Sequence, residues 1–357
     1  MKASIKYLLL SGILAGVTSC TDLDTEITTQ YTTYPDNPIA LSAKLEGCYY
    51  YLRNEAGLGR NYWEGVMLQG DELMGICFNG GYYDSGRLFF PTVHDLRPDT
   101  PGVGLMSDMM AGISYCNQVI MELTGGDEES GQDIGAPVRA VRAFYHFIMM
   151  DLYGDVPILA RTPESGEVIE RKPRAEVARW IEEELKAVTP LLTEENNAET
   201  YGRPNKWMAK ALLAKLYLNW GVYTCDDVTK VTNETSNNHE KLNDLVAVCD
   251  EIIESGIFEV GKGYRQKFFP NNGVQIAMPT KYVGGHQLDR FTTFKKANNC
   301  DVGPWGFTPS KSVAGAYILV PECVARFNLP GDERNQVILG GPQYVADYNN
   351  NYVFTDT

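Results

Sequence analysis

The residues of this chain best suited to chemistry are aromatic side chains in a stretch that lacks helical periodicity. Two adjacent pairs, Tyr62-Trp63 and Tyr82-Tyr83, lie within residues 56–102. An aromatic face can stack on a sugar ring, because the axial C–H groups of the sugar present an apolar, slightly positive surface to the π-electrons. The pairs therefore favour ring recognition, although the same rings could instead pack loops onto helices.

Polar neighbours and a second group of rings extend this candidate site. Asp71 and Arg87 stand close to the aromatic pairs in sequence and could hydrogen-bond hydroxyl groups, Arg with its planar fork. Trp305 is flanked by Gly-Pro and Gly, which predicts a turn, and binding residues concentrate on turns and loops. Tyr282 and His286 are weaker candidates of the same kind.

The sequence carries none of the common signatures of catalysis or metal binding. It has no H-E-x-x-H, no G-x-S-x-G, no P-loop and no C-x-x-C. The run Glu182-Glu183-Glu184 is most simply a solvated helix face. A glycosidase pair is defined by its separation in space, so sequence spacing cannot single one out. We expect no catalytic residue, metal or cofactor, and a surface glycoside hydrolase stays open as an alternative.

Charge excludes one class of partner. The chain of 357 residues has 46 acidic and 31 basic residues, for a formal charge of −15. Its field repels polyanions, which argues against nucleic-acid binding driven by phosphate neutralisation. Because 44% of the residues are hydrophobic, a sizeable core is expected.

The N-terminus has the pattern of an export signal. Two lysines precede the short apolar run of residues 7–17, and small residues lead to Cys20. This ending resembles the bacterial lipobox, which implies that residues 1–19 are removed and that Cys20 is diacylated, with chains such as palmitate. An ordinary signal peptide with a coincidental Cys is the alternative. Residues 20–37 are polar and acidic, and we interpret them as a tether.

Apolar residues then recur with helical spacing. The helix at 137–153 aligns with the one that follows Pro204 at an offset of 68 residues, twice the tetratricopeptide period of 34. Any two amphipathic helices could align as well. Residues 257–357 are rich in Gly, Pro and Asn, and we expect loops and short strands there. The predicted helices cover 38–55, 103–123, 137–153, 174–192, a segment from 204, and 241–255.

Three stretches together resemble the SusD/RagB family of outer-membrane nutrient-binding lipoproteins. They are the lipobox with Cys20, the segment VRAVRAFYHFIMMDLYGDVP at 138–157, and GRPNKWMAKALLAKLYL at 202–218. The resemblance implies a mainly α fold, with tetratricopeptide-like helix pairs in an α-α superhelical scaffold (38–256) and a loop-rich, short-strand ligand-binding part (257–357). It also implies a lipid-anchored protein at the cell surface that binds glycans, or in some members peptides, without cleaving them. The implied partner is a SusC-like TonB-dependent transporter.

One feature departs from the family pattern. Family members are longer and carry a further C-terminal helix, and nothing like it follows residue 345 here. We therefore expect a chain truncated relative to the family, which leaves a non-functional truncation product as a further alternative.

Overall fold

The computed structural model describes residues 38–53, 62–75, 77–78, 81–100, 104–125, 132–197, 200, 203–258, 317–337, 344–346 and 352–354. The chain divides into two compact units, residues 1–44 and 45–357. The first is described only over residues 38–44, which open helix α2 (Pro38–Gly47). The second unit contains all the other described helices and strands.

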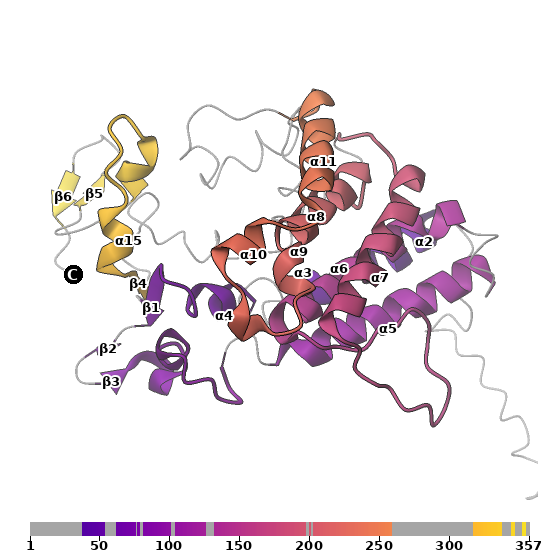
Figure 1. The fold of residues 1–357 in the computed structure, drawn as a ribbon, viewed down its shortest axis with the longest axis horizontal. Coiled ribbons are helices and arrows are strands. Elements are labelled where there is room, and N and C mark those ends of the chain that lie inside the picture. Colours follow the sequence, from indigo (N-terminus) through magenta and orange to yellow (C-terminus); the bar gives the residue numbers. More distant parts are fainter. Residues whose placement is uncertain are drawn as a thin grey trace, which may run out of the picture. The chain divides into compact units, whose positions relative to one another are not determined.

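The long helices of the second unit pack in succession. Helix α5 contacts α6, α6 contacts α7, α7 contacts α8, and α8 contacts α11 (Figure 1). Packing of each helix on its neighbours is the arrangement of stacked helical repeats, and it confirms the predicted mainly α fold. The bounds are α5 (Leu105–Thr124), α6 (Gln132–Tyr153), α7 (Arg174–Val188), α8 (Lys206–Leu218), α9 (Trp220–Tyr223), α10 (Asn233–Asn237) and α11 (Leu242–Glu254), with 3₁₀ turns at Thr189–Leu191 and Val228–Lys230.

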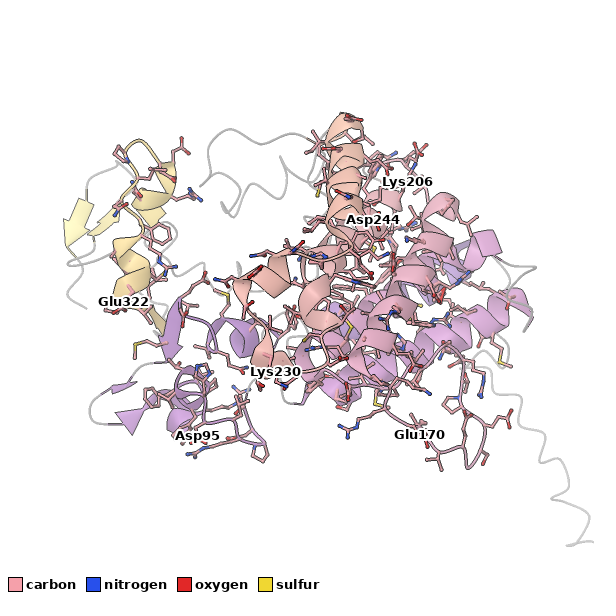
Figure 2. The ribbon with its side chains drawn as sticks, in the orientation of Figure 1. Asp95, Glu170, Lys206, Lys230, Asp244 and Glu322 are labelled. Carbon is pink, nitrogen blue, oxygen red and sulfur yellow. The ribbon has the colours of Figure 1, made fainter. Side chains whose placement is uncertain are left out.

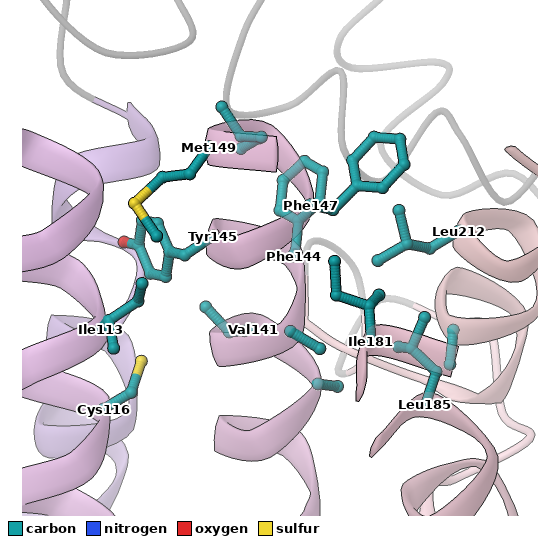
Figure 3. Packing of buried hydrophobic residues seen from close by; sticks show 14 of the residues in the cluster. Ile113, Cys116, Val141, Phe144, Tyr145, Phe147, Met149, Ile181, Leu185 and Leu212 are labelled. Atoms are coloured by element: carbon teal, nitrogen blue, oxygen red, sulfur yellow. The ribbon is translucent and has the colours of Figure 1, made fainter. Parts of the chain in front are cut away.

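Helix α6 is the centre of the core. Every residue from 140 to 150 is buried, and most of these side chains are apolar, with Arg142 and His146 as the exceptions. Figure 3 shows Val141, Tyr145 and Met149 directed toward α5, while Phe144 and Phe147 lie on the side of α7 and α8. A helix covered on two sides is buried all round, so α6 holds both neighbours in place.

Several predicted boundaries were wrong for identifiable reasons. Helix α6 begins at Gln132, so Pro137 lies inside it rather than at its start. A proline this close to the beginning of a helix removes one intrahelical hydrogen bond and leaves the rest of the helix intact. The predicted helix 38–55 is interrupted at Cys48 and Tyr49, where a turn separates α2 from α3 (Tyr50–Arg53).

The segment after α3 contains short elements. They are α4 (Trp63–Met67), β1 (Leu73–Gly75), β2 (Cys77–Phe78), β3 (Gly81–Tyr82) and 3₁₀ turns at Tyr83–Gly86 and Phe90–Val93. Trp63 was predicted to lie outside any helix, and this was wrong because it begins α4. Strand β2 pairs with β3. Gly75 packs so closely on the backbone of Leu88 that a Cβ would lie 2.4 Å from its carbonyl carbon.

A strand distant in sequence completes this loop-rich part. Strand β4 (Tyr317–Leu319) pairs with β1 in antiparallel register, Leu73 opposite Leu319. The remaining elements are short: α15 (Pro321–Ala325), a 3₁₀ turn at Glu333–Val337, and the paired strands β5 (Tyr344–Ala346) and β6 (Tyr352–Phe354). Among the described residues, no helix has the length and apolar character needed to cross a bilayer.

Candidate functional site

A hydrogen bond to a carboxylate links Tyr62 to the helical scaffold. Its hydroxyl is hydrogen-bonded to the side chain of Asp151, near the end of α6. Tyr223 of α9 donates its hydroxyl to the same group, with an Oη···Oδ1 distance of 2.6 Å. Asp151 itself is exposed. Two phenols thus hold one carboxylate at the surface, where its remaining lone pairs can accept hydrogen bonds from a ligand's hydroxyl groups.

The electrostatics of this cluster follow from its burial. Burial, followed by the charge of Asp151 and the hydrogen bond to it, raises the pKa of Tyr62 to about 12. The same causes, burial first, raise the pKa of Tyr223. Both phenols therefore stay protonated at neutral pH and act as donors. The ring of Phe147 packs edge-on against Tyr223 at 6.2 Å between centroids, which fixes the second donor.

Asp71 and Arg87 lie apart from this cluster. Asp71 is exposed in the turn between α4 and β1, and within the described residues it forms no hydrogen bond or ion pair with Tyr62 or Arg87. Arg87 donates from Nε to the backbone carbonyl of Asp99 at 3.1 Å. This bond ties down the loop, so the structure gives Arg87 a role in holding the loop.

The two nearby phenylalanine rings already contact other side chains. The guanidinium of Arg97 lies 3.5 Å from the ring centroid of Phe90, and Arg97 also pairs with Asp95 at 2.6 Å. Phe89 packs against Phe90 edge-on, at 6.1 Å between centroids. One face of Phe90 therefore already holds a cation, which leaves that face unable to stack on a sugar.

The other predicted site residues fall into two groups. Tyr82 ends β3 and Tyr83 begins the following 3₁₀ turn, and for these two and Trp63 the structure describes the backbone alone. The remaining four lie outside the described residues: Cys20, Tyr282, His286 and Trp305. Within the described chain no cluster of His, Cys, Asp or Glu could hold a metal ion.

The predicted solvated face at residues 182–184 was wrong, because only Glu183 is exposed. Glu184 accepts hydrogen bonds from Arg142 (Nη2···Oε2 3.0 Å) and Arg139 (Nε···Oε1 2.6 Å). Arg142 also donates to the side chain of Asn117 at 2.8 Å and to the carbonyl of Ala160. Buried charges are stable only when paired in this way, so Glu184 joins α7 to α6.

Glu182 serves the other side of α7. It accepts hydrogen bonds from Tyr217 of α8 (2.9 Å), from Lys241 beside α11 (2.6 Å) and from Lys186. Although burial alone would raise the pKa of Glu182, these three donors hold it below the usual value. The ammonium of Lys241 also lies 5.2 Å from the Trp220 ring centroid. The acidic run therefore fixes helix packing, and sequence spacing gave no sign of it.

The segment at 152–157, which carries much of the resemblance, also has a structural role. The Tyr153 hydroxyl accepts a hydrogen bond from the backbone N–H of Met106 at 3.1 Å, at the start of α5. Gly154 ends α6 with φ of 75°, a conformation that favours glycine. Asp155 then accepts from the N–H of Arg174 at 2.9 Å and caps α7. The motif thus connects three helices, and the exposed Asp151 lies one residue before it.

The helical part of the chain matches the model of a known family. The family model described as "SusD-like_3: Starch-binding associating with outer membrane" matches residues 105–218, from the first residue of α5 to the last of α8. Over these residues the chain is similar to the SusD-like family. No curated protein matches the sequence of this chain.

Solved structures agree with the fold. A laminarin-binding SusD-like protein is 20% identical with a TM-score of 0.53, over 66% of this chain and 49% of its own. Surface glycan-binding protein A from Bacteroides uniformis is 17% identical with a TM-score of 0.53, over 65% and 50%. A SusD superfamily protein from Bacteroides thetaiotaomicron is 16% identical with a TM-score of 0.58, over 83% and 62%. The chain spans about half the length of the first two of these proteins.

Proposed function

We propose that this SusD-like chain captures glycan oligosaccharides at the cell surface and passes them to a SusC-like TonB-dependent outer-membrane transporter. The observation that carries the proposal is the SusD-like match over α5 to α8, because that family is described by starch binding at the outer membrane. The names of two structural relatives, which bind laminarin or surface glycans, support the same ligand class.

Asp151 and Tyr62 are the described residues that fit sugar recognition. The carboxylate is exposed and held by two phenol donors. A carboxylate accepts hydrogen bonds from sugar hydroxyls and gains strength from its charge. Stacking is assigned to the predicted rings Trp63, Tyr82, Tyr83 and Trp305, with Tyr282, His286, Asp71 and Arg87 as further contacts. In this arrangement the protein needs no bond-breaking step, and the transporter supplies the energy of uptake.

Attachment to the outer membrane rests on Cys20. A diacylated N-terminus anchors a protein durably, since each buried CH₂ contributes about 0.8 kcal/mol. The tether of residues 20–37 would then leave the helical part free to meet ligand and transporter.

Affinity gel electrophoresis tests the ligand class. The purified chain is run through gels that contain starch, laminarin or other polysaccharides, and each mixture is then analysed for released sugars. We expect retarded migration in at least one gel and no product. Products would favour the glycoside hydrolase alternative. Retardation by no glycan, with binding to peptides, would favour a peptide-binding member of the family.

A further inference from the structure

Two cysteines from different elements meet in the core. Cys48 lies in the turn between α2 and α3, and Cys116 lies within α5. Both residues are buried, at 1% and 0% exposure. Both are free cysteines in the structure, and the side chain of Cys116 is hydrogen-bonded to that of Cys48. The two thiols are therefore in contact, although their elements are far apart in the sequence.

The packing around the thiols brings the same two elements together. A Cβ on Gly47 would overlap the ring of Tyr115, so the residues that directly precede the two cysteines are also in contact. From α6, the Tyr145 hydroxyl donates to the carbonyl of Cys48 at 2.7 Å. Figure 3 shows Cys116 on the side of α5 that faces Tyr145. Neighbouring backbone and side chains thus hold the turn against α5 at the position of the pair.

The other cysteines that the structure describes are placed differently. The thiol of Cys225 donates to the Val222 carbonyl at 3.1 Å, within its own turn of chain. Cys249 and Cys323 are half-buried and belong to separate elements, α11 and α15. Among these described residues, the buried pair is the one whose contacts suit a covalent link.

We propose that Cys48 and Cys116 are oxidised to a disulfide as the chain folds in the cell envelope, and that this bond ties the start of the folded chain to α5. Disulfides form and persist in the periplasm and at cell surfaces, where the surroundings are oxidising. The inference rests on the proposed function for that location. The oxidant is a disulfide of the envelope, carried by a protein thiol oxidase or by a small molecule.

The bond forms by two thiol–disulfide exchanges. The thiolate of one cysteine attacks a sulfur of the oxidant's disulfide, so that a mixed disulfide forms and one oxidant thiol leaves. The thiolate of the second cysteine then attacks the first cysteine's sulfur and releases the other oxidant thiol. The pair loses two electrons and two protons, and the oxidant's disulfide gains them as it becomes two thiols.

Burial determines when this reaction takes place. Burial is the main cause that raises the pKa of Cys116 well above its usual value. The folded, reduced core therefore contains little of the reactive thiolate, and a dissolved oxidant does not reach it. The exchange accordingly occurs while the chain is still folding, and the finished bond is protected from dissolved reductants for the same reason.

The bond would close a ring of chain from residue 48 to residue 116. Figure 2 shows the loop-rich part of this ring, with Asp95 labelled. A disulfide stabilises mainly by restricting the unfolded chain, and the effect grows with the length of the closed ring. The ring therefore holds at both ends the segment that carries most of the predicted glycan contacts, which are Tyr62, Trp63, Asp71, Tyr82, Tyr83 and Arg87.

Peptide mapping tests the bond on the full chain isolated from the envelope of bacterial cells that export it. The chain is unfolded in iodoacetamide, which caps every free thiol, and is then digested with and without reduction. We expect most of the Cys48 peptide to be joined to the Cys116 peptide before reduction and released after it. Capping of both cysteines would overturn the proposal and leave them as small apolar residues of the core. Links from either cysteine to Cys225 or Cys249 in similar amounts would overturn it as well.

Thermal unfolding tests what the bond does. The chain is melted as isolated, and again after it has been unfolded, reduced and refolded in reductant. We expect reduction to lower the melting temperature by about 4–8 °C. The variant with Cys48→Ala and Cys116→Ala should show no such shift, whereas the matched control Cys249→Ala should show the full shift. An equal fall in the double variant, or no fall in the unaltered chain, would overturn the role given to the bond.

Glycan binding by the same preparations separates this inference from the proposed function. A chain that binds glycan and carries both thiols free would overturn the disulfide and leave the proposed function intact. A chain with the two peptides joined that binds no glycan would leave the disulfide in place while the proposed function fails.

Discussion

Arg142 and Glu184 form an ion pair between α6 and α7 that is nearly closed to water. The Nη2···Oε2 distance is 3.0 Å, and the side chains are 1% and 7% exposed. Arg139 shares the same carboxylate, so one acid accepts hydrogen bonds from two guanidinium groups. The helical scaffold therefore depends on a buried charge at the centre of its SusD-like region.

Removal of that charge should be costly. Glu184→Gln leaves two guanidinium groups without their counter-charge, one of them buried, and breaking a buried pair from one side costs about 3–5 kcal/mol. Urea unfolding measures the change in the free energy of unfolding. Glu183→Gln, one residue away and exposed, is the matched control and should be neutral. Equal stability of the two variants would contradict the role given to Glu184.

His146 should make stability depend on pH. Burial is the main cause that lowers its pKa from 6.5 to about 3, so the ring is neutral in the folded state. Between these two values the unfolded state binds the extra proton, and stability is lost as pH falls below about 6.5. This single group should remove about 2 kcal/mol between pH 7 and pH 5.

The variant His146→Gln isolates this contribution. Glutamine does not titrate, so the difference in unfolding free energy between pH 7 and pH 5 should be smaller in the variant by about the amount given above. Urea unfolding at both values of pH gives the comparison. The same pH dependence in both proteins would show that His146 protonates freely when folded.

Sequence periodicity predicted the helices α5, α7, α8 and α11 well, because each presents apolar residues at regular spacing to a neighbour. It failed where contacts with a neighbouring helix decide whether a side chain is buried. The acids at 182 and 184 resemble a solvated run in sequence, and only the approach of α6 and α8 shows that both are paired and buried. Likewise, Asp151 became a site candidate only when the fold brought Tyr62 and Tyr223 to it.

Close packing of α5 on α6 gives a third prediction. A Cβ at Gly112 would lie 2.3 Å from Cζ of the Tyr145 ring, whose hydroxyl is held by the Cys48 carbonyl at 2.7 Å. Gly112→Ala should therefore lower the free energy of unfolding by about 1–3 kcal/mol through overpacking. Gly104→Ala is the control, since no heavy atom lies within 4 Å of a Cβ there. An unchanged melting temperature for Gly112→Ala would mean that the helices are less closely packed.

The lipid anchor is tested at Cys20. Cells that express the unaltered chain should incorporate labelled palmitate into it and retain it in the membrane fraction. The variant Cys20→Ala should lose the label and leave the membrane fraction, because no acyl chain remains. Label retained by the variant would place acylation elsewhere.

The central claim is glycan capture, and calorimetry tests it most directly. The purified chain is titrated with oligosaccharides from starch and laminarin and with a wider glycan panel. We predict saturable binding to at least one of them, weakened about tenfold or more by Trp63→Ala with Trp305→Ala, and weakened also by Asp151→Asn. Asp250→Asn, an exposed acid on α11, should bind normally. Absence of saturable binding to every glycan, by a chain that melts cooperatively, would contradict the account.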